Sequence, residues 1–466
     1  YGSYATWDEE LREVFLVREL HKKRPLIPCE PTFSERTTEV LETVKLIRGE
    51  GVGGLGAYVI SMASNPSDVL AVELLQNEAG IPGGLPVVPL FETLDSLQKA
   101  GERVEQLLVL ECVRDRIAER GDRMELMVGY SDSAKDAGLM MATWALFRAQ
   151  EEIAEVCQRH HVQPVFFHGR GGSIGRGGGP SHLAILSLPP GTLTDTMRVT
   201  EQGEVIQAKY GLPDIALRNL ELYVTAMAEA IAQPQPPAEP AWRELMDDMA
   251  GRSMAVYREL VRDEPLFTRY FQTITPAAEL GMLNIGSRPA RRGTGGGVES
   301  LRAIPWIFAW TQTRLMLPSW LGVGTALRAA LDSPRREVLA EMTEQWAFFR
   351  AFLSLVEMVL AKVDTDVHAL YVRRLADEDL AGLWERIEGQ LNETREAVLE
   401  VLGQRELLEA NPVLKRSIEV RNPYVDPLNV LQAELLGRLR QQEDPVLRDA
   451  LLVTINGIAS GMRNTG

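Results

Sequence analysis

Residues 162–180 of this 466-residue chain read Val-Gln-Pro-Val-Phe-Phe-His-Gly-Arg-Gly-Gly-Ser-Ile-Gly-Arg-Gly-Gly-Gly-Pro. The apolar run over 165–167 is typical of a buried strand, and it ends at His168. The glycines that follow let backbone N–H groups surround an anion, because no Cβ blocks the approach. Arg170 and Arg176 add planar cations that bind phosphate or carboxylate in bidentate fashion. A flexible linker is the alternative, but linkers contain no buried strand, so we predict a strand followed by an anion-binding loop.

Short apolar runs alternate with helical patterns on the amino-terminal side of this loop. The runs that predict strands are 57–62, 85–91, 124–130 and 162–167, separated by predicted helices at 66–78, from 92 to about 120, and at 136–160. Such βα units form a parallel sheet. Because three of the runs end in a polar or charged residue, and strand ends form the catalytic face of a (β/α) barrel, we expect part of such a barrel. The run 304–310 would supply a late strand, and an open doubly wound sheet is the alternative.

Helical patterns dominate the remainder of the chain. They cover 7–24 and 35–49 before the sheet and 217–231, 338–362 and 446–460 after it. A further helix is predicted to start at Asp426-Pro427, in the order of a cap followed by a proline at the first helical position. The expected fold class is therefore α/β, with extensive additional helices and a predominantly helical content.

Composition limits the classes of function that fit. The formal charge of −16, from 49 basic and 65 acidic residues, argues against general nucleic-acid binding. No apolar run approaches the 18 residues of a membrane span, and no signal peptide is visible. Cys29, Cys112 and Cys157 are too scattered for a disulfide framework or a zinc site. These features predict a cytoplasmic protein, and the start at Tyr1 instead of Met suggests a piece of a longer polypeptide.

Two carboxylates are predicted at strand ends. Glu92 follows the run 85–91, and Asp132 follows the run 124–130. Carboxylates on one face of a barrel can hold a hard divalent cation, whose remaining positions are filled by water and substrate oxygens. The alternative is that each residue caps the helix after it. We predict a metal site, because an anion-binding loop is expected at the same edge.

Other polar residues are less specific. Lys135 can reach a bound anion or can be a solvated lysine at a helix start, and the basic, glycine-rich stretch 286–297 can be a mobile lid or a disordered segment without function. Neither a P-loop nor a dinucleotide fingerprint is present. The remaining histidines have no evident partners in the sequence and are expected to fill surface or core: His21, His160, His161, His182 and His368.

Motifs spread along the chain resemble those of the phosphoenolpyruvate carboxylase family. The stretch 167–180 is similar to the family's glycine-rich signature, and the matches run collinearly from about residue 7 to the last residue. Further similar segments are Pro-Leu-Phe-Glu-Thr at 89–93, Gly-Tyr-Ser-Asp-Ser-Ala-Lys-Asp-Ala-Gly at 129–138, Arg-Val-Thr-Glu-Gln-Gly-Glu at 198–204, Gly-Ser-Arg-Pro at 286–289, Glu-Ser-Leu-Arg at 299–302 and Gly-Met-Arg-Asn-Thr-Gly at 461–466.

The resemblance implies a (β/α)8 barrel with many helices, usually in a homotetramer, that converts phosphoenolpyruvate and bicarbonate into oxaloacetate and phosphate with Mg²⁺ or Mn²⁺. It implies that residues 1–320 are the carboxyl-terminal part of the barrel with its active-site loops. The implied roles are metal binding by Glu92 and Asp132, phosphate binding by Arg170 and Arg302, catalysis by His168, Arg176, Arg288 and Lys135, and a CO₂ pocket that includes Leu90 and Met127.

An inhibitor site is also implied, in a helical region over 321–466. Lys362, Arg421 and Asn464, with Arg176 as the fourth member, match positions at which the family binds aspartate or malate. The positive side chains and the amide suit a dicarboxylate.

One departure from the family pattern is evident. The family's other half carries a Thr-Ala-His-Pro-Thr motif with an essential histidine, and no Ala-His-Pro occurs here. We therefore expect this chain to be the carboxyl-terminal half of the enzyme, active only with its amino-terminal half. Two alternatives are a phosphoenolpyruvate-utilising phosphotransferase, for which no nucleotide-binding or phosphohistidine domain is visible, and a non-catalytic half that binds effectors and partner subunits.

Overall fold

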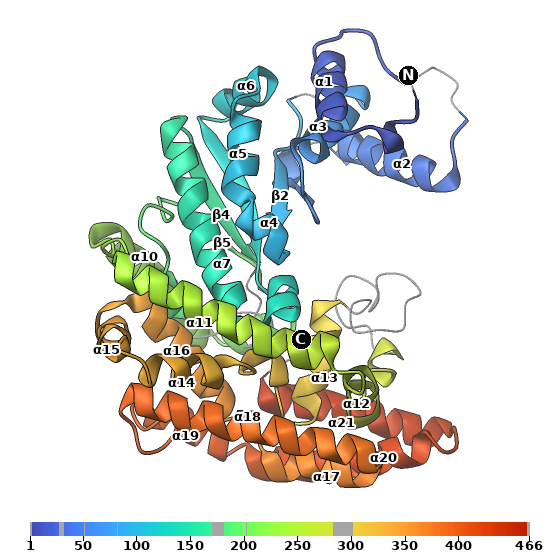
Figure 1. Ribbon diagram of the computed structural model, residues 1–466. Helices are drawn as coiled ribbons and strands as arrows, with labels where there is room; N and C mark the ends of the chain where they lie inside the picture. Colours follow the sequence, from blue (N-terminus) through green and yellow to red (C-terminus); the bar gives the residue numbers. More distant parts are fainter. Residues whose placement is uncertain are drawn as a thin grey trace. The chain divides into compact units, whose positions relative to one another are not determined.

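The computed structural model describes residues 2–27, 32–50, 52–81, 83–169, 181–201, 203–282 and 302–463. The chain forms two compact units (Figure 1). The first comprises residues 1–129, 146–169 and 191–199, and the second comprises residues 130–145, 170–190 and 200–466.

The first unit contains a parallel five-stranded sheet whose strands lie side by side in chain order. All four neighbouring pairs are parallel, so the carboxyl ends of the strands meet at one edge. The α/β class predicted from the sequence is thereby confirmed, and the last strand, only two residues long, was not predicted. The strands are β1 (Tyr58–Ile60), β2 (Val87–Phe91), β3 (Arg123–Gly129), β4 (Gln163–Gly169) and β5 (Arg198–Val199).

Helices pack against this sheet and against one another. α3 contacts β2 and α6 contacts β3, and the side chains of Leu70 and Val88 are fully buried in the resulting core. The single helix expected from 92 to about 120 is three helices, because the backbone leaves the helical region at Lys99 and again at Leu110. The helices of this unit are α1 (Glu9–Leu20), α2 (Glu35–Glu50), α3 (Pro66–Glu78), α4 (Leu94–Gln98), α5 (Ala100–Leu108), α6 (Glu111–Glu119) and the later part of α7 (Ser131–Arg159).

Gly138 interrupts α7 near its start. Its φ of 77° and ψ of 165° are not helical, so a first turn from Ser131 is separated from the long helix that follows. A Cβ at this position would also lie 3.1 Å from the ring of Tyr257. The sequence predicted a helix from residue 136, and the turn before it carries the polar residues that follow β3.

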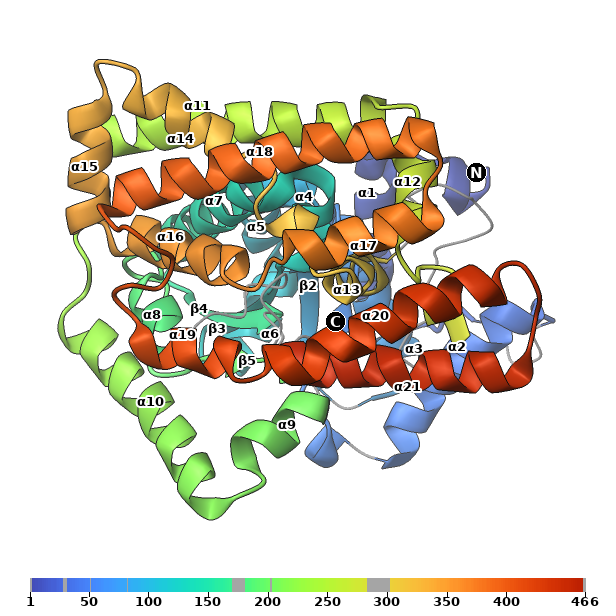
Figure 2. The same cartoon turned by 90° about the horizontal axis from the view of Figure 1, so that it is seen from below.

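The described residues of the second unit form helices and no strand. In the view of Figure 2, α20 and α21 lie side by side, and α17 packs against α20. The α-helices after α7 are α8 (Ser181–Leu186), α9 (Gly203–Tyr210), α10 (Pro213–Ala232), α11 (Pro240–Arg258), α12 (Phe267–Ile274), α13 (Ala303–Gln312), α14 (Val323–Leu331), α15 (Arg336–Gln345), α16 (Ala347–Leu360), α17 (Thr365–Leu375), α18 (Glu378–Leu402), α19 (Pro412–Glu419), α20 (Asn422–Leu439) and α21 (Pro445–Met462).

The strand predicted at 304–310 is wrong, because these residues lie in α13. Trp306 and Trp310 are one helical turn apart, both fully buried, with ring centroids separated by 5.6 Å. Phe271 packs against both rings. A helix that is apolar on every side has no polar stripe, so its sequence cannot be distinguished from a buried strand by periodicity.

Two helix boundaries also differ from the prediction. The pattern over 338–362 is divided between α15 and α16 at Trp346, whose backbone is extended. Pro427 lies inside α20, which begins at Asn422 with Pro423 in its first turn. The helix start predicted at Asp426-Pro427 is therefore wrong: the helix begins about one turn earlier, its N-cap is Arg421, and Pro423 is its second residue.

Four of the histidines expected to have no partners do have them, including His21, whose Nδ1 lies 2.7 Å from the carbonyl oxygen of Val17. The ring of His160 lies 2.6 Å from a carboxylate oxygen of Glu105, and His182 lies 3.7 Å from Glu229. His368 is fully buried, with Nε2 2.7 Å from the hydroxyl of Tyr270. Burial lowers its pKa to about 3, so it is a neutral core residue at physiological pH.

No helix in the described ranges is long and apolar enough to cross a membrane.

Candidate active site

Two predicted site residues lie at the carboxyl edge of the sheet in the first unit. Glu92 directly follows β2, is 7% exposed, and accepts a hydrogen bond from the backbone N–H of Met62 through Oε1 at 3.0 Å. His168 is the penultimate residue of β4 and is 4% exposed, with Val128 and Val199 as its neighbours in the sheet. The edge therefore presents an acid and an imidazole from alternate strands.

A small apolar patch lies beside the acid. Leu90 of β2 and Met127 of β3 are direct partners in the sheet. A Cβ at Gly129 would lie 2.6 Å from the Cβ of Glu92 and 3.4 Å from Leu90, and a Cβ at Gly169 would lie 3.1 Å from Met127. These glycines leave the space that the acid and the apolar side chains occupy. Three residues singled out from the sequence are thus brought together, Leu90, Glu92 and Met127, while His168 is paired in the sheet with Val128 and Val199.

Three other predicted residues belong to the second unit. Asp132 lies in the first turn of α7, and Lys135 follows it one turn later. The carbonyl oxygen of Lys135 accepts a hydrogen bond from the hydroxyl of Tyr257 at 2.8 Å, which fixes this turn next to α11. Arg302 has extended backbone and directly precedes α13.

The stretch 286–297 lies outside the described residues. So do four predicted site residues: Arg170, Arg176, Arg288 and Asn464.

Metal-ligating side chains are sparse in the described ranges. No group of three or more His, Cys, Asp or Glu side chains there could hold a metal ion by itself. Cys112 and Cys157 are both free thiols, and burial raises the pKa of Cys157 to about 12. Cys112 and Cys157 therefore form no disulfide with each other, and Cys29 lies outside the described residues.

The two predicted inhibitor-site residues in the described ranges converge on the end of α21. Lys362, just after α16, donates from Nζ to the carbonyl oxygen of Met462 at 3.3 Å. Arg421, just before α20, donates from Nη1 to the carbonyl oxygen of Gly461 at 2.8 Å. Residues about sixty positions apart therefore bind adjacent carbonyls of one helix end, in line with the negative end of its dipole.

Cations crowd this position. Lys362 is 5% exposed, and its pKa is lowered to about 7, first by burial and then by the charges of Arg421, Arg463 and Arg314. Burial, Arg463 and Arg314 also lower the pKa of Arg421. An entering anion would favour the charged forms. Sequence reasoning missed Arg314, for which the only signal was a cation within a long apolar stretch, and missed Arg463 in the terminal motif.

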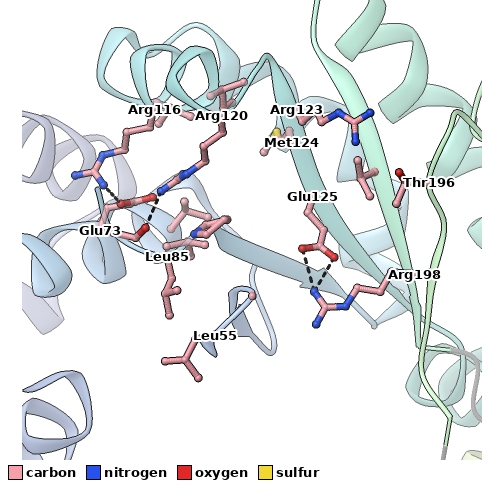
Figure 3. Close-up of a pocket in the computed structure, with 18 residues that line it drawn as sticks. Leu55, Glu73, Leu85, Arg116, Arg120, Arg123, Met124, Glu125, Thr196 and Arg198 are labelled. Atoms are coloured by element: carbon pink, nitrogen blue, oxygen red, sulfur yellow. Dashed lines mark hydrogen bonds and ion pairs between the residues drawn. The ribbon is translucent and has the colours of Figure 1, made fainter. Parts of the chain in front are cut away.

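The first unit also contains a cavity (Figure 3). It has a volume of about 540 Å³ and apolar walls that include Leu85 and Met124. Arg116 pairs with Glu73, and Arg198 donates to Glu125 at 2.9 Å, as the dashed lines show. None of the residues predicted from the sequence lines it, so a cavity of ligand size does not by itself identify the active site.

Comparison with known proteins identifies the family. The sequence model of the phosphoenolpyruvate carboxylase family matches residues 1–466. The chain belongs to the phosphoenolpyruvate carboxylase family. The resemblance inferred from its motifs is confirmed, and it extends over the whole chain.

Curated relatives named phosphoenolpyruvate carboxylase are similar along this chain. The protein of Chromohalobacter salexigens is 53% identical over 470 residues, which cover 100% of this chain and 53% of that protein. The protein of Pseudomonas aeruginosa is 52% identical over 468 residues, and that of a Marinomonas species is 50% identical over 466 residues, each with the same two coverages. The chain therefore spans about half the length of the relatives it matches.

Proposed function

We propose that the polypeptide carrying this chain converts phosphoenolpyruvate and bicarbonate into oxaloacetate and phosphate, which replenishes oxaloacetate. The main structural support for this proposal is the carboxyl edge of the sheet, where the buried carboxylate of Glu92 lies beside the apolar pair Leu90 and Met127. The reaction needs both features, because it requires a charged site for phosphate and a dry site for CO₂. Membership of the phosphoenolpyruvate carboxylase family supports the same reaction.

The five strands are proposed to be part of a (β/α)8 barrel. Their parallel order and the polar residues at their carboxyl ends support this architecture. The division into an active-site region over 1–320 and a helical region over 321–466, the homotetramer, the cytoplasmic location and the need for an amino-terminal half remain proposals of the same kind.

Glu92 and Asp132 are proposed to bind Mg²⁺ or Mn²⁺. Carboxylate oxygens are the ligands that these cations prefer, and the glycine at 129 leaves room beside Glu92. Asp132 follows Gly129 by three positions in the sequence. A bound cation would neutralise charge on the phosphate and enol oxygens.

The chain's own residues would act in sequence. Arg170 and Arg302 bind the phosphate of phosphoenolpyruvate and stabilise its transfer to bicarbonate. The transfer breaks the bond between phosphorus and the enol oxygen and leaves carboxyphosphate and the enolate of pyruvate. Carboxyphosphate then releases CO₂ and phosphate. Leu90 and Met127 retain CO₂ in a water-poor pocket until the enolate carbon attacks it, which forms oxaloacetate.

Four further residues are proposed to assist this chemistry. His168 can donate a ring N–H to an oxygen of the transferring group, while Lys135, Arg176 and Arg288 add positive charge around the anionic intermediates. Water must stay out of the site, because protonation of the enolate would give pyruvate instead of oxaloacetate.

The cation cluster in the second unit is proposed to bind aspartate or malate as an inhibitor. Lys362 and Arg421 would bind the two carboxylates, joined by Asn464 and Arg176. Two observations support the roles of Lys362 and Arg421: both bind carbonyl oxygens at the end of α21, and both have lowered pKa values. If the inhibitor holds Arg176, the glycine-rich loop is withdrawn from the substrate, which would shift the enzyme towards an inactive state.

Oxaloacetate formation by the polypeptide that carries this chain tests the proposed reaction. With phosphoenolpyruvate, bicarbonate and Mg²⁺, we expect phosphate and oxaloacetate in equal amounts, and both should depend on bicarbonate. Pyruvate as the sole organic product, or phosphate release that is independent of bicarbonate, would contradict the proposal.

A second candidate is a non-catalytic module that binds a dicarboxylate. It is favoured by one observation: Lys362, Arg421, Arg463 and Arg314 all belong to the second unit of this chain. Calorimetric binding of malate by the 466-residue chain, together with no turnover when the amino-terminal half of a relative is added, would favour this candidate over the enzyme.

A further inference from the structure

Arg314 is a buried arginine that neither the motifs nor the proposed chemistry uses. It follows α13, its side chain is only 1% exposed, and its backbone has a φ of 59°, a left-handed conformation that is uncommon for arginine. Burying a guanidinium is costly unless its N–H groups are paired. The hydrogen-bond partners of the guanidinium therefore indicate the structural role of Arg314.

The guanidinium joins two segments that are far apart in sequence. Nε donates to the carbonyl oxygen of Lys362 at 3.1 Å, Nη1 donates to Asp426 at 2.8 Å, and Nη2 donates to the side-chain oxygen of Asn422 at 3.2 Å. Asp364 lies 3.9 Å from Nη2, and its backbone N–H donates to the carbonyl oxygen of Arg314 at 3.0 Å. One planar fork thus connects the turn after α16 with the start of α20.

Both segments carry a cation of the proposed inhibitor site. Lys362 is bound through its own carbonyl, and Arg421 immediately precedes Asn422. The guanidinium also pairs with Asp426 at 2.8 Å. Arg314 is therefore bonded to Lys362 itself and to the residue that follows Arg421.

A buried amide network anchors α13, the helix that precedes Arg314. The side chain of Gln312 donates to the carbonyl oxygen of Ile455 at 3.3 Å and accepts from Gln432 at 3.0 Å. Its carbonyl oxygen accepts from Asn429 at 2.7 Å. The end of α13 is thus fixed against α20 and α21 independently of the guanidinium, so a change at Arg314 alone need not displace this helix.

We propose that Arg314 is a positioning residue for the anion site formed by Lys362 and Arg421: its guanidinium holds the segments that carry the two cations at a fixed separation. The inference rests on the proposed dicarboxylate site. It adds a residue that would contact no ligand and would act only through the geometry of the two that do.

The test compares Arg314→Lys with Arg440→Lys in the 466-residue chain. Lysine keeps the charge of Arg314 but cannot make three directed hydrogen bonds from one plane. Arg440 is the matched control, because it also ties α20 to other segments: it donates to the carbonyl oxygen of Thr275 at 2.8 Å and to Glu279 at 3.1 Å, at the opposite end of the helix.

Two quantities are measured in each variant. Calorimetry gives the Kd of L-malate and of L-aspartate, and hydrogen exchange reports the amides of residues 362–364 and 421–426. We expect Arg314→Lys to raise both Kd values by about tenfold or more and to accelerate exchange in both segments. Arg440→Lys is expected to change each Kd by less than about twofold, even if it lowers the melting temperature equally.

The two proposals fail in different ways. Normal affinity and normal exchange in Arg314→Lys would overturn the positioning role while the dicarboxylate site stands. An equal loss of affinity in both variants would also overturn it, because the loss would then reflect general destabilisation. If the unmodified chain binds neither dicarboxylate, the inhibitor site fails, and unchanged exchange in Arg314→Lys would then overturn the positioning role as well.

Discussion

The carboxyl edge of the sheet and the cation cluster at the end of α21 are both predicted anion sites, but they are built in opposite ways. At the sheet edge, Glu92 follows β2 and His168 lies near the end of β4, and the glycines at 129 and 169 leave space for Glu92 and Met127. At the end of α21, Lys362 and Arg421 come from separate helices and are held by carbonyl oxygens and by a buried arginine. The sheet edge depends on local strand order, whereas the cluster depends on distant contacts.

The charges of the two regions differ as well. The sheet edge offers a buried carboxylate, which is suited to a cation that in turn attracts phosphate. The cluster offers cations directly, at the cost of desolvating a lysine, and its lowered pKa reports that cost. Ligand binding at the cluster should consequently be coupled to pH. The predictions below test this contrast.

The largest effect is expected for Glu92→Gln in the complete polypeptide. Glutamine keeps the size of the side chain but removes its charge, so the proposed metal site loses a ligand. We expect oxaloacetate formation to fall by more than about a hundredfold, since loss of an outer-shell partner of a ligand alone costs 10–100-fold. A steady-state assay over a range of Mg²⁺ concentrations measures this.

Glu357→Gln is the matched control for that experiment. Glu357 is also buried, at 6% exposed, and accepts a hydrogen bond from the backbone N–H of Leu408 at 2.7 Å. Its variant should retain activity, although both substitutions replace a buried acid. Equal activity losses in the two variants would indicate general damage and remove Glu92 from the proposed metal site.

Lys362 should make dicarboxylate binding depend on pH. Its pKa is lowered from 10.5 to about 7, and an anion binds the protonated form, so binding above pH 7 requires uptake of a proton. Affinity for malate should therefore decrease by up to about tenfold per pH unit above 7 and become constant below it. Calorimetry between pH 6 and pH 9 measures this, and Lys362→Met should abolish binding. An affinity independent of pH would contradict the buried, charged role of this lysine.

The same lowered pKa has a consequence for stability. Between pH 7 and 10.5 the unfolded chain holds a proton on Lys362 that the folded chain lacks, so this residue's contribution to the free energy of unfolding rises with pH. Lys362→Met should remove that rise and should stabilise the chain most at low pH. Lys415→Met serves as a control, because Lys415 pairs with Glu406 on the surface and its pKa is raised instead. Denaturant titrations at several pH values compare the variants.

A smaller effect is expected for Gly129→Ala. The added methyl group would lie 2.6 Å from the Cβ of Glu92, a distance that requires backbone movement. Overpacking of this kind costs about 1–3 kcal/mol in unfolding free energy, and displacement of Glu92 should reduce activity as well. Gly382→Ala in α18 is the control, since no atom lies within 4 Å of its added Cβ and alanine favours a helix. Unchanged activity in Gly129→Ala would show that the close approach at this edge is not needed.

The smallest effect is expected in the cavity of Figure 3. Arg198 pairs with Glu125, but its side chain is 44% exposed, so solvent screens the interaction. Arg198→Gln should lower the free energy of unfolding by no more than about 1 kcal/mol and should leave the KM for phosphoenolpyruvate unchanged. An increase in KM comparable with that of a phosphate-site variant would connect this cavity to the substrate.

Much of the first unit was predictable because its signals are local. Apolar runs that end at Phe91 and near Gly129 define strands, and the polar residues after them must lie at one edge when the strands are parallel. Helix boundaries were less predictable. Where Gly138 interrupts α7, the ring of Tyr257, more than a hundred residues away, leaves no room for a side chain, and no local pattern contains that information.

The amino-acid sequence by itself determined the parallel sheet, the acid and the imidazole at its strand ends, and the family, because periodicity and motifs are properties of neighbouring residues. Only the tertiary structure decided that 304–310 is a helix, since an apolar run takes its form from what surrounds it. It also decided the burial and lowered pKa of Lys362 and the fork of Arg314, because desolvation and directed hydrogen bonds depend on residues brought together from distant parts of the chain.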